Sequence, residues 1–389
     1  MSITTPAGFV AAGVASGIKA PGALDLALVA SDDGRAVPAA ATFTSNRAAA
    51  APVQVSRAHL EATGGRAAAV VVNSGNANAA TGRSGRLAAE RMCELAAGGL
   101  GVDAREVLVC STGLIGFELP REPIESGIPA LVAARSGSAA SAAAAAAAIL
   151  TTDSGPKEAL VHGPGFTVAG MAKGAGMLAP DMATMLAFLT TDAAVEPTAL
   201  TDLLRVAVAD TFNSMTIDGC TSTNDTVVLL ASGRAGPADP GVVVEAVTAV
   251  CADLAALMAA DAEGASKVAH VRVTGARTDG DAHRAARKVA GSLLVKCSFN
   301  GEDPYWGRVA SELGSAGVDF DMDRLSIAYG DTVVCRDGIG IPYDRGAVAD
   351  HLAGSQIELH CALGLGDGAG VVMTVDLGHG YIDENRTTS

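Results

Sequence analysis

Aromatic residues are scarce in this sequence, and positive charge is scarcer than negative charge. Phe, Trp and Tyr make up 3% of the 389 residues, and 27 Lys and Arg stand against 42 Asp and Glu, a formal net charge of −15. Nucleic acids and anionic membranes bind clustered Lys and Arg, so this balance argues against both as partners. Hydrophobic residues still make up 49%, which indicates a globular core built largely from small side chains.

Paired cysteines, metal-binding motifs and targeting signals are also missing. The seven cysteines include no C-x-x-C pair, which favours a reduced, cytoplasmic protein over a disulfide framework or a structural zinc site. The seven histidines include no H-x-x-x-H pair, so we expect no metal. The N-terminus lacks the basic and apolar regions of a secretory signal. No run of about 18 strongly apolar residues is evident, so we expect no membrane span.

What remains is a mixture of helices and strands along the whole chain. A length of 389 residues suits two domains, and the mixture predicts the α/β or mixed α+β class, with sheets packed against helices. A domain boundary is expected near 190–200, just before a helix that starts at Pro197. Helices are expected at 84–98, 136–150, 197–214, 240–262, 281–292 and 305–316. Strands are expected at 67–73, 106–112, 184–190, 226–232, 268–274, 294–299 and 370–377.

Polar clusters recur beside these expected elements. They are NSGNANAATG (73–82), CSTGLIG (110–116), TTDSGPK (151–157) and TIDGCTSTNDT (216–226). Any one of them is explained by turn chemistry, which uses Ser, Thr, Asn, Asp and Gly. Their recurrence favours a site instead, because hydroxyls, amides and exposed backbone N–H groups suit a polar ligand or an oxyanion.

The most unusual segment is AKGAGMLAPDMATML (172–186), in which a glycine-rich loop leads directly into an apolar strand. The small residue Ala183 precedes Thr184 there and leaves its carbonyl accessible. A hydroxyl beside a strained carbonyl can attack it and form an ester by N→O acyl shift, which water then cleaves. The product is an N-terminal threonine whose own α-amine serves as base. G-x-S-x-G and P-loop motifs are absent from the sequence.

This segment resembles the signature of ornithine acetyltransferases (glutamate N-acetyltransferases), which self-cleave before the threonine of an A-T-M-L segment. The four polar clusters match family blocks in the family's order. So do GVASGIKAPGALDLALV (13–29), DAEGASK (261–267), GEDPYWGR (301–308) and the closing YIDENRTTS. The resemblance therefore covers the chain from end to end.

The resemblance implies cleavage between Ala183 and Thr184, into chains 1–183 and 184–389. Thr184 would take an acetyl group from N2-acetylornithine and pass it to glutamate in a ping-pong cycle of arginine biosynthesis. The residues matching the oxyanion pair are Thr112 and Gly113. The residues matching substrate-binding positions are Thr151, Lys173, Thr184, Glu263, Asn385 and Ser389.

The resemblance also implies an assembly and a fold. The two cleavage products would form a heterodimer that pairs into a heterotetramer. Its fold would have two interleaved α/β domains with the active site in the cleft between them. No cofactor is implied, but the family includes enzymes that also take acetyl from acetyl-CoA, and the sequence leaves that second donor open.

Other interpretations stay open. One is an amidohydrolase or aminopeptidase with the same nucleophile and water as acceptor. Others are a paralogue in secondary metabolism and a binding protein that has lost its chemistry. The chain departs from the family pattern at Cys220, where an acid is common, and at Tyr305, where an asparagine is expected. Its tail after Asn385 is one residue shorter than usual.

Overall fold

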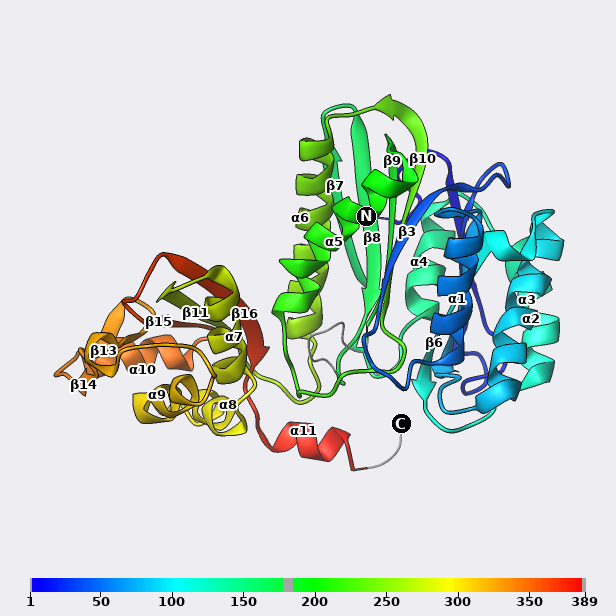
Figure 1. The fold of residues 1–389 in the computed structure, drawn as a ribbon. Coiled ribbons are helices and arrows are strands. Elements are labelled where there is room, and N and C mark those ends of the chain that lie inside the picture. Colours follow the sequence, from blue (N-terminus) through cyan, green and yellow to red (C-terminus); the bar gives the residue numbers. More distant parts are fainter. Residues whose placement is uncertain (1, 178–184, 387–389) are drawn as a thin grey trace. The chain divides into compact units, whose positions relative to one another are not determined.

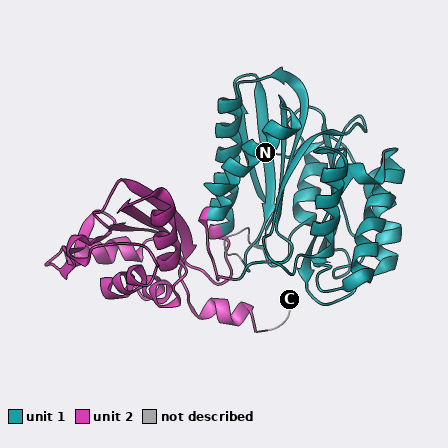
Figure 2. Ribbon diagram, viewed as in Figure 1, with its two compact units in different colours: residues 1–213, 220–258, 389 teal, residues 214–219, 259–388 magenta. Residues whose placement is uncertain are grey.

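The computed structural model of this chain describes residues 2–177 and 185–386. These residues form two compact units, which Figure 2 colours separately. Unit 1 takes its residues from 1–213 and 220–258, and unit 2 takes its residues from 214–219 and 259–388. The structure is of the mixed α+β class, with three sheets packed against helices.

The boundary expected near 190–200 is wrong. Strand β9 (Leu186–Ala194) and strand β10 (Thr226–Pro237) are parallel neighbours in one sheet, and helix α5 (Pro197–Ala209) connects them. Parallel neighbours need a crossover of this kind, so the helix that starts at Pro197 continues unit 1. The expected chains 1–183 and 184–389 are products of cleavage and not compact units of the fold, and they stay a prediction.

Unit 1 contains two of the sheets. A four-stranded sheet has the order β1-β2-β5-β6, and a six-stranded sheet has the order β4-β3-β10-β9-β8-β7. The remaining strands are β1 (Phe9–Val14), β2 (Leu26–Ser31), β3 (Val37–Phe43), β4 (Arg66–Ala67), β5 (Ala69–Asn76), β6 (Val107–Leu114), β7 (Lys157–Gly163) and β8 (Phe166–Lys173). The remaining helices are α1 (Ala51–Ala62), α2 (Gly82–Leu100), α3 (Arg121–Ala133), α4 (Ala139–Ala148) and α6 (Pro240–Ala260).

The two sheets of unit 1 lie between layers of helices (Figure 1). One core cluster joins α4 to inward-facing residues of both sheets, including Val72 of β5 and Phe188 of β9. A second cluster packs α1, α2 and α3 on the other face of the four-stranded sheet. On the six-stranded sheet, a Cβ at Gly170 would lie 2.8 Å from Val250 of α6, so helix and sheet approach closely there.

Helix α6 corrects the expectation that no run is apolar enough to cross a membrane. By length and composition alone Pro240–Ala260 passes that test, with a mean hydropathy of 2.0. Half of its most apolar window is buried inside the protein, and its buried side includes Val247, Val250 and Leu254. A core helix of a globular protein has the same character, so the test alone is weak evidence for a membrane span.

Unit 2 contains one six-stranded sheet of order β14-β13-β12-β15-β11-β16. Its strands are β11 (Val268–Ala276), β12 (Ser326–Tyr329), β13 (Thr332–Arg336), β14 (Ile339–Gly340), β15 (Gln356–Ala362) and β16 (Gly368–Val375). Its helices are α7 (Asp279–Ala290), α8 (Leu293–Asn300), α9 (Trp306–Gly314), α10 (Arg345–Ala353) and α11 (His379–Glu384). Helices α7 to α10 share one buried core with the sheet.

All six expected helices are present within a few residues, but the strand expected at 294–299 is wrong, since those residues lie in α8. The Ser292 hydroxyl caps α8 by accepting a hydrogen bond from the Val295 amide. Val295 and Phe299 are four residues apart and both buried, as on one face of a helix. A short apolar run is ambiguous until such a cap is recognised.

Candidate functional site

The expected oxyanion pair lies at the end of β6, where the chain leaves the four-stranded sheet. Thr112 is buried, and Gly113 lies beside Gly75 of the parallel strand β5. Gly113 has φ +126°, and a Cβ there would come within 2.3 Å of the Gly75 carbonyl carbon. Only glycine tolerates both conditions, so the glycine of S-T-G is required by how closely β5 and β6 meet.

Hydrogen bonds between buried side chains fix this end of the sheet. The Ser111 hydroxyl donates to Asn73 Oδ1 at 2.6 Å. Asn224 Nδ2 donates to the carbonyls of Ala77 at 2.6 Å and Ser111 at 2.9 Å. Buried and partnered polar groups of this kind hold a rigid geometry, so three of the four polar clusters singled out in the sequence contribute to one cradle.

A small cavity of about 30 Å³ opens at this cradle, lined by Ala77, Thr112, Gly113, Ile115, Met177, Ser222, Thr223 and Asn224. A hydroxyl and a backbone N–H beside a cavity are the groups that stabilise a developing oxyanion. Met177 is the last described residue before 178–184. The expected cleavage site, Ala183 and Thr184, lies outside the described residues.

A buried carboxyl group, that of Asp225, contacts the first residue described after that segment. The amide of Met185, the residue bonded to Thr184, donates to Asp225 Oδ1 at 2.9 Å. Burial raises the pKa of Asp225 well above its ordinary value, although the Met185 amide, the Lys173 ammonium and the Ser222 hydroxyl act in the lowering direction. Sequence reasoning did not single out Asp225, since it reads as one more turn residue in T-S-T-N-D-T.

Thr151 and Lys173, two expected substrate-binding residues, meet at Asp153. The Thr151 amide donates to Asp153 Oδ2 at 3.1 Å, and the Gly174 amide donates to Oδ1 at 2.7 Å. Lys157 Nζ lies 2.6 Å from Oδ1, and Lys173 Nζ lies 3.9 Å from Oδ2. The three charged side chains are 0–3% exposed. Burial acts to raise the pKa of Asp153, but Lys173 and Lys157 hold it below its ordinary value.

A third lysine adds to the positive charge of this group. Lys19 Nζ donates to the carbonyls of Leu24 at 3.0 Å and Leu150 at 2.6 Å. Burial lowers the pKa of Lys19, and the nearby Lys173 ammonium acts in the same direction, while Asp25 and Asp153 act against it. Lys19 is therefore under the influence of two carboxylates, Asp25 and Asp153, as well as of the Lys173 ammonium.

Glu263 and Asn385, which resemblance alone placed in the site, contact each other within unit 2. Asn385 Nδ2 donates to Glu263 Oε2 at 2.9 Å and to the Tyr381 carbonyl at 3.0 Å. Gly264 makes this contact feasible, because a Cβ there would lie 2.0 Å from the Tyr381 amide nitrogen. The expected residue Ser389 lies outside the described residues, and the expected location of the site between two domains stays a prediction.

Two departures from the family pattern, Cys220 and Tyr305, lie on the surface. Cys220 is exposed. Tyr305 is also exposed and immediately precedes α9, with the Arg308 guanidinium 5.8 Å from the centre of its ring. Neither residue lines the small cavity.

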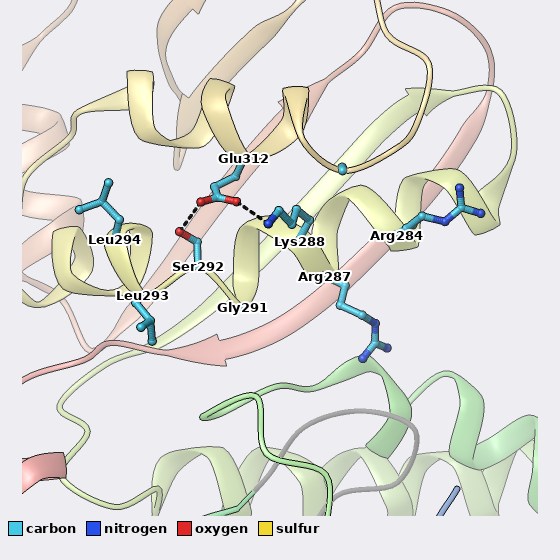
Figure 3. A pocket seen from close by; sticks show the side chains of 9 residues that line it. Arg284, Arg287, Lys288, Gly291, Ser292, Leu293, Leu294 and Glu312 are labelled. Atoms are coloured by element: carbon cyan, nitrogen blue, oxygen red, sulfur yellow. Dashed lines mark hydrogen bonds and ion pairs between the residues drawn. The ribbon is translucent and has the colours of Figure 1, made fainter. Parts of the chain in front are cut away.

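A much larger surface pocket of about 610 Å³ lies in unit 2 and contains none of the expected site residues. Its polar side chains, drawn in Figure 3, come from α7, α9 and the start of α8. Lys288 and Ser292 both contact Glu312 there. Within the described part of the chain, no group of three His, Cys, Asp or Glu side chains is arranged to hold a metal ion.

Comparison with known proteins gives a consistent result. A profile described as the ArgJ family matches residues 10–387. The arginine biosynthesis bifunctional protein ArgJ of Mycolicibacterium paratuberculosis is 48% identical, over 100% of this chain and 96% of the relative. The protein of the same name from Thermobifida fusca is 45% identical over the full length of both.

Two solved structures are also similar. An arginine biosynthesis bifunctional protein of Bacillus halodurans is 33% identical, covers 51% of this chain and 96% of its own, and has a TM-score of 0.49. An ornithine acetyltransferase of Mycobacterium tuberculosis in complex with ornithine is 46% identical, covers 46% of this chain and 94% of its own, and has a TM-score of 0.43.

Proposed function

This chain belongs to the ArgJ family, and from that premise we propose that it is an acetyltransferase of arginine biosynthesis. It moves the acetyl group of N2-acetylornithine to glutamate through an ester on Thr184. The observation that carries the proposal is the small cavity in unit 1. The Thr112–Gly113 pair lines it together with Met177, which leads into the segment containing Ala183–Thr184.

The reaction starts with self-cleavage. The Thr184 hydroxyl attacks the Ala183 carbonyl, and the resulting ester is hydrolysed, so Thr184 gains a free α-amine. In the first half-reaction Thr184 Oγ attacks the acetyl carbon of N2-acetylornithine. The C–N bond breaks, and the ornithine nitrogen leaves with the proton taken up by the α-amine. In the second, the amine of glutamate attacks the ester and regenerates the hydroxyl. Thr112 and Gly113 stabilise each oxyanion.

Substrate recognition follows from charge. Both amino acids carry a carboxylate, which the ammonium of Lys173 binds with the help of Thr151. Ornithine also carries a side-chain ammonium, which suits the carboxylate of Glu263. Asn385 orients that carboxylate, since its amide donates to Glu263 Oε2. Ser389 completes the substrate contacts. Charge-assisted hydrogen bonds of this kind are about twice as strong as neutral ones.

Three finer points belong to the same proposal. The relatives are named bifunctional, and acetyl-CoA as a second acetyl donor would account for that name here. No cofactor is required for the transfer. The two cleavage products stay together as a heterodimer, pair into a heterotetramer and work in the cytoplasm. An amidohydrolase or aminopeptidase reaction, or a role in secondary metabolism, is not favoured by any contact in the site.

The test combines electrophoresis with a transfer assay. Wild-type protein should run as two fragments of nearly equal length and convert N2-acetylornithine and glutamate into ornithine and N-acetylglutamate. Thr184→Ala should stay in one piece and be inactive. Thr190→Ala is the matched control, since Thr190 lies on β9 and its hydroxyl donates to the Ile3 carbonyl. Free acetate in place of N-acetylglutamate would favour the hydrolase.

A further inference from the structure

We propose that Asp376 is a positioning residue that holds Glu263 and Asn385 together, so that the Glu263 carboxylate meets the side-chain ammonium of ornithine. The inference rests on the proposed function, because it concerns how that site recognises one of its two amino acids. Asp376 directly follows β16 and is 2% exposed. In the sequence it reads only as part of the strand expected at 370–377, so its contacts in the folded chain carry the argument.

The first observation is that this one buried carboxylate accepts four hydrogen bonds. Asp376 Oδ1 accepts from the amides of Ser266 and Lys267, both at 2.8 Å. Its Oδ2 accepts from the Ser266 hydroxyl at 2.7 Å and from Asn300 Nδ2 at 2.8 Å. Burial acts to raise the pKa of Asp376, but these hydrogen bonds hold it below its ordinary value. The acceptor is therefore ionised at neutral pH, which makes its hydrogen bonds the stronger kind.

The second observation is that these hydrogen bonds join three segments of unit 2. The donors lie in the loop that joins Glu263 to β11 and at the end of α8. Asp376 itself begins the segment that leads from β16 into α11 and on to Asn385. Its own amide donates to the Lys267 carbonyl at 3.1 Å. The carboxylate thus fixes the start of the segment that carries Asn385 to the loop that carries Glu263.

The third observation is that α11 contributes no buried side chain, although all of its residues are in the described part of the chain. Its link to the Glu263 loop includes exposed hydrogen bonds. The Gly264 amide donates to Glu384 Oε1 at 3.1 Å. Asn385 Nδ2 donates to Glu263 Oε2 at 2.9 Å. Because water competes for such bonds, each adds only modestly to stability. The position of α11 therefore depends on how its lead-in segment is fixed at Asp376.

The chemistry of the two amino acids makes the inference testable. Ornithine carries an ammonium at the end of its side chain and glutamate carries a carboxylate there, so a well-placed Glu263 favours the first and not the second. In a ping-pong cycle, kcat/KM for each substrate reports its own half-reaction. A change that displaces Glu263 should therefore lower kcat/KM for N2-acetylornithine and spare kcat/KM for glutamate.

Asp376→Asn tests the inference, because asparagine keeps the shape and can still accept the two backbone hydrogen bonds while it loses the charge and the second acceptor. We expect complete self-cleavage and a kcat/KM for N2-acetylornithine that falls about ten- to hundredfold. The kcat/KM for glutamate should stay within about threefold of wild type. An unchanged kcat/KM for N2-acetylornithine overturns the inference, as does an equal loss for both substrates.

A double-mutant cycle separates positioning from a general structural role. Glu263→Ala leaves no carboxylate to be positioned. In that background Asp376→Asn should change kcat/KM for N2-acetylornithine by less than about twofold, because the two residues act as one unit. If Asp376→Asn causes its whole loss again in the Glu263→Ala background, it acts by another route and the inference fails.

Asp192→Asn is the matched control for loss of stability. Asp192 is a largely buried aspartate of unit 1 that accepts from the amides of Ala7 and Thr167. This variant should unfold at a lower urea concentration but keep both kcat/KM values within about twofold. If it lowers kcat/KM for N2-acetylornithine as much as Asp376→Asn does, the effect reflects general destabilisation and the inference fails.

Asn300→Ala covers the case in which Asp376→Asn does not fold. Asn300 is an exposed residue at the end of α8, and its Nδ2 donates to Asp376 Oδ2. Its loss removes one of the four hydrogen bonds, so kcat/KM for N2-acetylornithine should fall about three- to tenfold while that for glutamate is spared. Equal values for the variant and wild type would overturn the inference.

Calorimetric titration distinguishes this inference from the proposed function. The ligands are ornithine and norvaline, which has the same carbon chain without the side-chain ammonium. Relative to wild type, Asp376→Asn should raise the Kd for ornithine about tenfold or more and keep the Kd for norvaline within about twofold. Equal changes for both ligands overturn the inference. A wild-type protein that binds ornithine but transfers no acetyl group overturns the proposed function alone, and one that does not bind ornithine overturns both.

Discussion

The Asp153 group of unit 1 and the Glu312 group of unit 2 are built from the same kinds of side chain. Each has a carboxylate between two neighbours, with an ammonium 2.6 Å away in the first and 3.2 Å away in the second. The side chains of the first group are 0–3% exposed, while Lys288 and Glu312 are 45% and 24% exposed. Figure 3 draws this second pair. Water and salt screen the second group and not the first.

The comparison teaches that pocket size is a poor guide in this chain. The pocket with Lys288 and Glu312 measures about 610 Å³, while the cavity beside Thr112 and Gly113 measures about 30 Å³. The small cavity is nevertheless surrounded by buried polar groups with fixed partners, and Leu293 and Leu294 at the large pocket are exposed. Preorganised polar groups, more than volume, are what a reaction needs.

The largest expected effect is on kcat, which should fall when the small cavity beside Thr112 is altered and not when the large pocket of unit 2 is altered. Thr112→Val replaces a buried hydroxyl by a methyl group of the same shape on a strand, where valine is favoured. We expect kcat to fall about 10²- to 10³-fold, as for other oxyanion donors, with KM within about threefold. Self-cleavage should slow as well, because it forms a similar oxyanion. Steady-state kinetics on the cleaved fraction gives the measurement.

Ser292→Ala provides the counterpart in the large pocket. Ser292 caps α8 and donates to Glu312 at 2.9 Å, so its loss should cost about 1 kcal/mol of unfolding free energy and leave kcat unchanged. The comparison would be broken if Ser292→Ala lowered kcat or Thr112→Val did not.

How much the sequence reveals depends on how local each signal is. Helix α5 could be predicted because its first residue, Pro197, and its apolar positions lie within a few turns of each other in sequence. The end of β6 could be predicted because S-T-G directly follows an apolar run. Strands such as β1 and β3 were missed, since alanine-rich FVAAGV and VPAAATF carry little β signal. The contacts of Asp153 were not predicted, because Lys173 and Gly174 lie about twenty residues away in sequence.

Long-range pairs show the same limit. Glu263 and Asn385 are separated by 122 positions, and only the resemblance to a family suggested that they act together. Their hydrogen bond depends on Gly264, because only a residue without a Cβ lets the α11 backbone approach so closely. No spacing of residues in the sequence predicts this approach. The strand expected at 294–299 was wrong for the opposite reason, since its local composition was read without the Ser292 cap.

Unit 2 also contains a buried lysine, Lys296, which tests the effect of burial apart from the exposed pair of Lys288 and Glu312. It is 3% exposed, it donates to the Ile217 carbonyl, and burial lowers its pKa to about 8. The unfolded chain therefore binds this proton up to pH about 10.5 while the folded chain has released it. Stability must then rise with pH between about 8 and 10.5.

The measurement is urea unfolding of wild type and Lys296→Met at several pH values from 7 to 10. The wild-type free energy of unfolding should gain on the order of 2 kcal/mol relative to the variant across this range. Other titrating groups cancel in the difference. Parallel curves for the two proteins would show that burial does not govern this lysine.

The smallest effect is expected for the exposed pair itself. A double-mutant cycle with Lys288→Met and Glu312→Gln should give a coupling energy below about 1 kcal/mol, and it should decrease further at 1 M salt, where screening acts over about 3 Å. The same cycle with Asp153→Asn and Lys157→Gln should give a larger coupling that salt hardly changes, because ions cannot reach a carboxylate that is 0% exposed. If the two couplings were equal in size and in salt dependence, burial would not be what distinguishes the regions.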